Sequence, residues 1–125
     1  DPSSGTWYQV TDQGAREGNY LESSATALFI YTLAKAINKG YIDNEYIEPT
    51  QKAFDGMVKT FTRLEEDGSY TITNCCAVAG LGGDSKRYRD GSFEYYISEP
   101  IIENDPKSVG SFILAAIEYE KMTKK

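Results

Sequence analysis

Residues 20–40 constrain the fold most, because a polar start is followed at once by a long apolar segment that ends at a glycine. Apolar and small side chains recur there at the three- and four-residue spacing of one helical face: Ala25, Leu28, Phe29, Thr32, Leu33, Ala36 and Ile37. Gly40 follows Lys39 where a left-handed C-terminal cap is expected. The pattern predicts a buried helix with a defined end.

The start of this helix is polar, with Asn19, Glu22, Ser23 and Ser24 close together. Free backbone N–H groups and the positive end of the helix dipole also point there. One interpretation is an ordinary N-terminal cap, for which serine and asparagine are common residues. The other is the rim of a polar pocket built from the same atoms, and the sequence leaves both open.

Charge and composition exclude several function classes. The chain has 125 residues, the length of one domain, and a net charge of −6. Its basic residues are scattered apart from Lys86, Arg87 and Arg89, so nucleic acid is not expected as a partner. Histidine is absent, which removes the commonest general base and metal ligand from this stretch.

The sequence begins DPSSGTWY, without an initiator methionine, and we expect it to be part of a longer protein. No run approaches the roughly 18 apolar residues of a membrane span. Cys75 and Cys76 are adjacent, which is poor geometry for an ordinary disulfide. We interpret them as small buried hydrophobic residues on a strand.

Residues 6–10 alternate as in a short strand. Trp7 and Gln9 would then share a face, pairing a flat apolar ring with an amide. Trp7 either fills the core or forms with Gln9 a surface suited to a sugar ring.

A second helix is expected over residues 45–65, antiparallel to the first, with an apolar face of Ala53, Phe54, Met57, Val58, Phe61 and Leu64. Gly56 weakens this helix, so we expect a close helix neighbour there. Residues 70–78 have the β-branched and aromatic content of a strand. The glycine-rich segment 80–84 fails both the dinucleotide and the phosphate-loop patterns and predicts a loop.

The last third of the chain predicts an extended stretch over residues 92–98 and then a third helix. Asp105 and Pro106 are strong helix-start signals, as N-cap and first helical residue. The expected buried face of this helix is Val109, Phe112, Ile113, Ala116 and Ile117, and residues 118–125 are expected to form a solvated end.

Three blocks carry a resemblance to a known family: GTWYQV, then REGNYLESSATALFIYTLAKAINKGY, then YRDGSFEYYISEPIIENDPKSVGSFILAAIEYE. Together they resemble the C-terminal part of the unsaturated rhamnogalacturonyl hydrolases and, more distantly, the unsaturated glucuronyl hydrolases. The resemblance implies a mainly α fold: about the last third of an incomplete (α/α)6 barrel with short β-hairpin loops. Residues 1–125 would then form the C-terminal portion of one catalytic domain.

Such enzymes remove a 4,5-unsaturated uronic acid from pectin-derived oligosaccharides by hydrating the enol ether. The family's catalytic aspartate and substrate-facing histidines lie upstream of the matching region, so the resemblance implies no catalytic residue here and an inactive piece. It implies part of the pocket wall, for which the expected substrate contacts are Trp7, Gln9, Glu22, Ser23, Ser24, Arg89, Asp90, Tyr95 and Tyr96. The resemblance implies no metal or organic cofactor, and an unsaturated uronyl oligosaccharide is the expected partner.

Helices taken from a closed barrel leave apolar faces uncovered, which predicts self-association or a companion chain. The rival interpretation is a free-standing helical module that binds a glycan or a protein without chemistry.

Overall fold

The computed structural model describes residues 1–84 and 88–124 of the chain. Three long helices dominate it: α1 (Ser23–Lys39), α2 (Ile47–Phe61) and α4 (Pro106–Thr123). Shorter elements connect them: a 3-10 turn (Asn44–Tyr46), α3 (Phe93–Ser98), β1 (Thr62–Leu64), β2 (Tyr70–Ile72), β3 (Cys75–Cys76) and β4 (Ile101–Ile102). The mainly α class expected from the sequence is confirmed.

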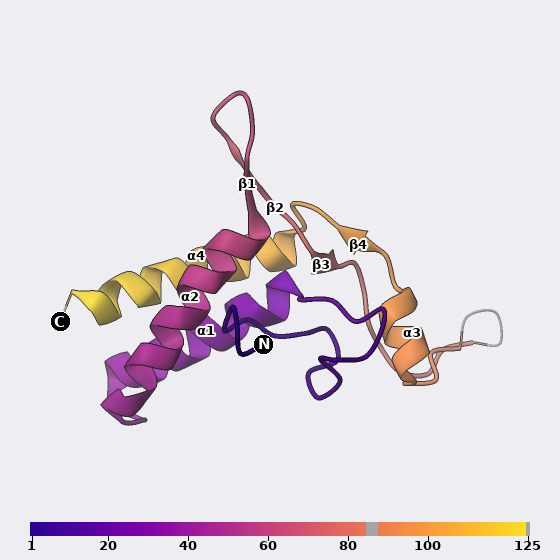
Figure 1. Ribbon diagram of the computed structural model, residues 1–125, viewed down its shortest axis with the longest axis horizontal. Helices are drawn as coiled ribbons and strands as arrows, with labels where there is room; N and C mark the ends of the chain where they lie inside the picture. Colours follow the sequence, from indigo (N-terminus) through magenta and orange to yellow (C-terminus); the bar gives the residue numbers. More distant parts are fainter. Residues whose placement is uncertain (85–87, 125) are drawn as a thin grey trace.

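Helices α1 and α4 are the central pair of the fold and pack along their length. Both begin on the right in Figure 1 and run to the left, so they are parallel and their N-terminal ends lie at the same side of the molecule. Helix α2 runs back beside α1, as the short connection between them predicts. The loops, α3 and the small strands gather near the common N-terminal end of α1 and α4.

The β structure consists of two small antiparallel pairs. β1 pairs with β2 in a register that places Leu64 opposite Tyr70, and this hairpin projects away from the helices (Figure 1). β3 pairs with β4, with Cys75 opposite Ile102. Asn74 has a φ of 58° and separates β2 from β3. The single strand expected over residues 70–78 is therefore two short strands with a kink between them.

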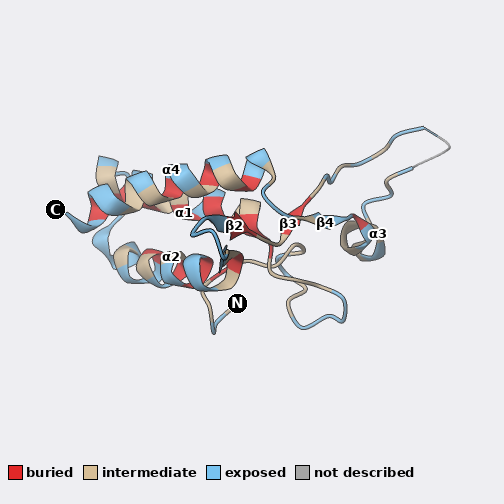
Figure 2. Ribbon diagram, turned by 90° about the horizontal axis from the view of Figure 1, so that it is seen from above, coloured by how far each residue is buried: buried red, intermediate tan, exposed pale blue. Residues whose placement is uncertain are grey.

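The core lies where the three helices face one another, as the buried positions in Figure 2 show. One cluster combines Ala27 and Ile30 of α1 with residues of the other two helices; its further members are Ala53, Met57, Phe61 and Ala115. A second cluster joins Ala34, Ile37 and Met122 near the other end. Cys75 and Cys76 are buried on β3, as predicted.

The predicted buried faces of α1 and α4 are largely wrong. In α1 the buried residues include Ala27, Ile30 and Ala34, whereas the expected Leu28 and Phe29 are exposed. In α4 the buried residues are Ser108, Ser111, Ala115 and Met122, and the expected Ile113 and Ile117 face outward. Both helices carry apolar residues on two faces, and periodicity alone does not say which face meets a neighbour. Met122 also shows that α4 remains packed beyond residue 118.

The expected helix boundaries are largely confirmed. Gly40 adopts a left-handed conformation with φ 70°, and its N–H caps the carbonyls at the end of α1. Asp105 caps α4 by accepting from the Lys107 backbone N–H at 2.8 Å, with Pro106 in the first turn. α2 is shorter than the expected 45–65, because Thr62 turns extended and starts β1.

Two expected strands are not formed. Within residues 6–10 only Tyr8 makes a bridge, to Leu21, because the segment opposite becomes α1 two residues later. Residues 93–98 form α3 instead of an extended stretch. Ser92 caps this helix by accepting from the Tyr95 N–H at 3.1 Å. A local cap therefore outweighs the β propensity of its aromatic residues.

Gly56 does allow a close approach, but the neighbour is not a helix. A Cβ placed there would lie 1.8 Å from the carbonyl oxygen of Ser4, in the N-terminal turn. Within the described residues, no helix is long and apolar enough to cross a bilayer.

Candidate functional site: a cleft at the paired helix starts

A cleft of about 490 Å³ lies at the common N-terminal end of α1 and α4. Its lining comes from the first loop, the start of α1, the segment after β3 and the start of α4: Gln9, Glu22, Ser24, Ala25, Cys76, Ala77, Val78, Ala79 and Lys107. The volume falls within the range of roughly 300–1,000 Å³ that small-molecule sites occupy. Four segments distant in sequence thus meet around one concave surface.

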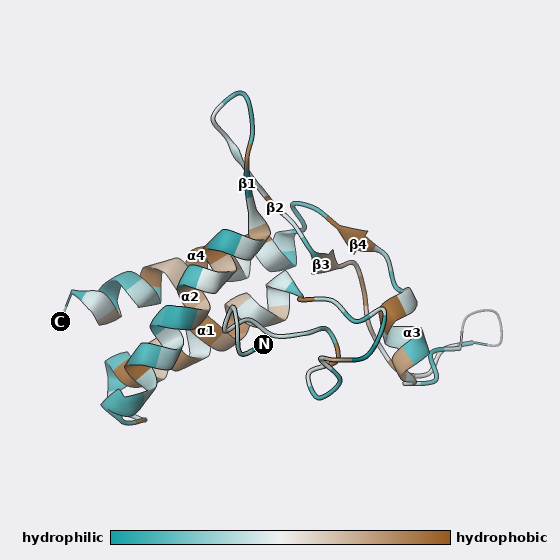
Figure 3. Cartoon of the chain, viewed as in Figure 1, coloured by the Kyte–Doolittle hydropathy of each residue, from teal (hydrophilic) through white to brown (hydrophobic). Residues whose placement is uncertain are grey.

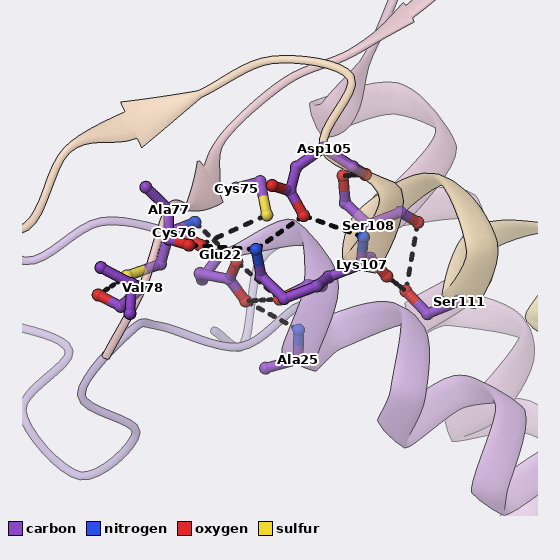
Figure 4. Close-up of polar contacts among 11 residues, drawn as sticks. Glu22, Ala25, Cys75, Cys76, Ala77, Val78, Asp105, Lys107, Ser108 and Ser111 are labelled. Carbon is purple, nitrogen blue, oxygen red and sulfur yellow. Dashed lines mark hydrogen bonds and ion pairs between the residues drawn. The ribbon is translucent and has the colours of Figure 1, made fainter. Parts of the chain in front are cut away.

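Glu22 fixes the geometry of this cleft (Figure 4). Its side chain is 1% exposed, and its carboxylate accepts from the backbone N–H of Ala25 at 2.7 Å and from that of Cys76 at 3.0 Å. The Ser24 hydroxyl donates to the same carboxylate at 2.9 Å. Glu22 is therefore the N-cap of α1 and also links α1 to β3. The sequence left open a cap or a pocket rim, and Glu22 is both a cap and part of the cleft lining.

Lys107 forms the opposite wall, in the first turn of α4. Its ammonium donates to Asp105 Oδ1 at 2.7 Å and to the Ala77 carbonyl oxygen at 3.0 Å. The hydrogen bond to Asp105 raises the pKa of Lys107, and the same bond holds the pKa of the Asp105 carboxyl below its usual range. Lys107 is therefore a cation at neutral pH, and it fastens α4 to the segment that follows β3.

Gln9 and the two cysteines complete the interior of the site. Gln9 Nε2 donates to Cys76 Sγ at 3.2 Å, which orients the amide at the cleft. Cys75 is fully buried behind it, where burial raises the pKa of its thiol. Among the described residues, no group of three or more Cys, Asp or Glu side chains could hold a metal ion.

A second polar cluster surrounds Glu99, whose side chain is fully buried. Tyr95 donates its hydroxyl to Glu99 Oε1 at 2.8 Å, and the Gly80 N–H donates to that hydroxyl at 3.1 Å. Arg89 Nε lies 3.7 Å from Glu99 Oε1, an ion pair too long for a hydrogen bond. Desolvation and the bond to Glu99 raise the pKa of Tyr95. Because Gly80 follows Ala79, this cluster is continuous with the wall of the cleft.

The residues expected to contact substrate thus fall into groups. Gln9, Glu22 and Ser24 line the cleft, and Arg89 and Tyr95 belong to the Glu99 cluster, where Tyr96 lies 5.1 Å from Tyr95 between ring centroids. Ser23 is fully buried beneath the helix start, and Asp90 accepts from the Ser92 N–H at 2.9 Å.

Trp7 is separate from the cleft lining. Its ring packs beside Phe29 at 5.1 Å between centroids and against the core, whereas the Gln9 amide contacts Cys76. Of the basic cluster noted in the sequence, Lys86 and Arg87 lie outside the described residues, as does Ser85. Lys107 is the cleft residue that the sequence interpretation missed; its position two residues after the Asp105 cap was the available signal.

Comparison with known proteins gives the family. The model of Glycosyl Hydrolase Family 88 matches residues 1–123. Protein Atu3128 of Agrobacterium fabrum is 37% identical over 118 residues, which cover 91% of this chain and 51% of that protein.

Solved structures agree with this match. A glycoside hydrolase from family 105 of Clostridium acetobutylicum ATCC 824 is 46% identical, with a TM-score of 0.92 over 96% of this chain and 33% of that one. A possible family 105 member from Klebsiella pneumoniae is 26% identical, with a TM-score of 0.72 over 98% of this chain and 27% of that one.

The chain therefore spans about half the length of the Agrobacterium relative and about a third of the Clostridium structure. The expected fold, part of an (α/α)6 barrel, is confirmed by this agreement, and a free-standing binding module is not favoured. A match along nearly its whole length shows that the chain belongs to Glycosyl Hydrolase Family 88.

Proposed function

We propose that the protein acts as a glycoside hydrolase that releases a 4,5-unsaturated uronic acid from pectin-derived (rhamnogalacturonan) oligosaccharides. An aspartic acid protonates the double bond, water adds at the neighbouring carbon, and the resulting hemiketal breaks down into two sugars. On this proposal the aspartic acid lies on polypeptide outside residues 1–125, and this chain alone does not turn over substrate. The observation that carries the proposal is the cleft at the parallel starts of α1 and α4, in a chain of this family.

Within that enzyme, this chain forms part of the wall that holds the sugar. The cleft offers two groups that can hydrogen-bond to sugar hydroxyls, the Ser24 hydroxyl and the Gln9 amide. The Ser24 O–H donates a hydrogen bond to Glu22, and the lone pairs of its oxygen can still accept. Arg89, in the loop before α3, and Tyr95 and Tyr96, on α3, extend this wall. Glu22 positions the wall, because its carboxylate already accepts hydrogen bonds from Ser24, Ala25 and Cys76.

A chimaera tests the proposal. This chain would replace the matching third of the Clostridium acetobutylicum hydrolase, with which it shares 46% identity. We expect the chimaera to remove the ultraviolet absorbance of the double bond in an unsaturated rhamnogalacturonan disaccharide. The intact Clostridium hydrolase, assayed on the same disaccharide, is the reference for the rate. The isolated chain and a hydrolase lacking that third should leave the absorbance unchanged. Turnover by the isolated chain would show that the proton donor is misplaced.

We also propose that the outward apolar face of α4 is covered by polypeptide that completes the barrel, and by a second copy of this chain when that polypeptide is missing. The face consists of Ile113, Leu114 and Ile117, which are 55%, 45% and 46% exposed. Figure 3 shows hydrophobic residues along the same helix. Spacing of three and four residues places them on one stripe, the pattern of a helix that packs against another.

A further inference from the structure

Among the described residues that line the cleft, Lys107 is the one cation, and its surroundings suit a negatively charged part of a ligand. Helical side chains lean toward the helix N-terminus, which brings the Lys107 ammonium back over the cleft to reach Ala77. The side chain remains 54% exposed although two acceptors hold its head group. An ammonium group has three N–H donors, so one is left to point at a ligand.

The carboxylates near Lys107 do not cancel this preference. Glu22 lines the cleft, but it is 1% exposed and its charge is met by two backbone N–H groups and the Ser24 hydroxyl. Asp105 is bound by the backbone N–H of Lys107 as well as by its ammonium, and its side chain is 14% exposed. Both carboxylates also cap helix starts, where the dipole offsets negative charge. The accessible polar groups are therefore a cation, a hydroxyl and an amide.

We propose that Lys107 is the specificity-determining residue of this cleft and that it binds the carboxylate of the uronic acid, while Ser24 and Gln9 contact hydroxyls of the same sugar. This inference rests on the proposed function, because it assumes an acidic sugar as ligand. It adds that the chain distinguishes a free uronic acid from its neutral methyl ester. A charge-assisted hydrogen bond of this kind corresponds to about 10- to 100-fold in affinity.

Calorimetric titration of the chain with an unsaturated galacturonyl-rhamnose disaccharide and with its methyl ester tests the inference. We expect the unmodified protein to bind the free acid at least about tenfold more tightly than the ester. Lys107→Gln should abolish that difference, so that the acid and the ester bind with affinities within about twofold of each other. Lys107→Arg, which keeps the cation, should retain a preference for the acid.

Lys121→Gln is the matched control, since Lys121 lies on the same helix and is paired in a similar way with Glu118, away from the cleft. It should bind both sugars like the unmodified protein. Equal affinity for acid and ester in the unmodified protein, or a preference that survives Lys107→Gln, overturns the role of Lys107 but leaves glycan binding standing. Failure of both sugars to bind the isolated chain also overturns the role of Lys107, whereas the proposed function is decided separately by turnover in the chimaera.

Discussion

At the scale of single residues, Glu22 shows what sequence reasoning reached and where it stopped. The polar start of α1 was predicted, and both its capping role and its place at a cleft follow from the structure. The bond from Cys76 to Glu22 joins positions 54 residues apart, and no local pattern encodes it. Of the two interpretations of Trp7, the structure shows the packing against the core, beside Phe29.

Glu22→Ala should lower the free energy of unfolding by about 2–4 kcal/mol, because α1 loses its cap and the buried Cys76 N–H loses its acceptor. Glu22→Gln should cost less, since the amide keeps one acceptor oxygen. Urea unfolding followed by circular dichroism measures both. Glu17→Ala, on the exposed loop before α1, is the control and should change stability by less than about 0.5 kcal/mol. A urea midpoint of Glu22→Ala equal to that of Glu17→Ala would contradict the stabilising role of the hydrogen bonds between Glu22 and the Ala25 and Cys76 N–H groups.

At the scale of elements, helix positions were predictable because caps are local. Gly40, Asp105 and Pro106 each mark a helix boundary through their own backbone chemistry. The faces of α1 and α4 and the conformation of residues 93–98 were not predictable in the same way. The first depends on which neighbours are present, and the second depends on Ser92 and on the Tyr95 to Glu99 bond.

Two helical glycines should respond in opposite directions to alanine. Gly56→Ala should destabilise the protein by about 1–3 kcal/mol, because its Cβ would collide with the Ser4 carbonyl oxygen and displace the N-terminal turn. Gly110→Ala should stabilise it by roughly 0.5–1 kcal/mol, since the new Cβ would meet no described atom within 4 Å beyond its chain neighbours and its own helix backbone, and alanine favours the helix. Thermal unfolding compares the two variants. A Gly56→Ala variant that is not destabilised would contradict the packing described for α2, and a destabilised Gly110→Ala variant would contradict the open space described at Gly110.

At the scale of the whole molecule, the family was predictable from the three resembling sequence blocks, and the comparisons confirm the partial barrel. The grouping of site residues needed the structure, because it depends on α1 and α4 being parallel. Ile113 and Ile117 were expected in a core and lie on the surface. In the full barrel proposed here, they would lie at an interface between helices.

Sedimentation velocity tests that surface. We expect the average mass of the unmodified chain to rise with concentration, because the stripe on α4 is apolar and exposed. The double variant Ile113→Lys with Ile117→Lys should remain a monomer, with a stability within about 0.5 kcal/mol of the original since both side chains are already outside the core. Lys121→Gln should associate like the unmodified chain. A compact monomer of the unmodified chain at high concentration would count against the proposal.

The hydrogen bond between Glu22 and β3 determines which substitutions this region tolerates. The carboxylate holds the main-chain N–H of residue 76 and makes no demand on the side chain there. Alanine, serine or valine at that position would leave this hydrogen bond in place, whereas proline, which has no N–H, would remove it. Divergent versions of the chain can therefore change residue 76 without losing this hydrogen bond to Glu22, while any residue other than cysteine there removes the sulfur that accepts from the Gln9 amide.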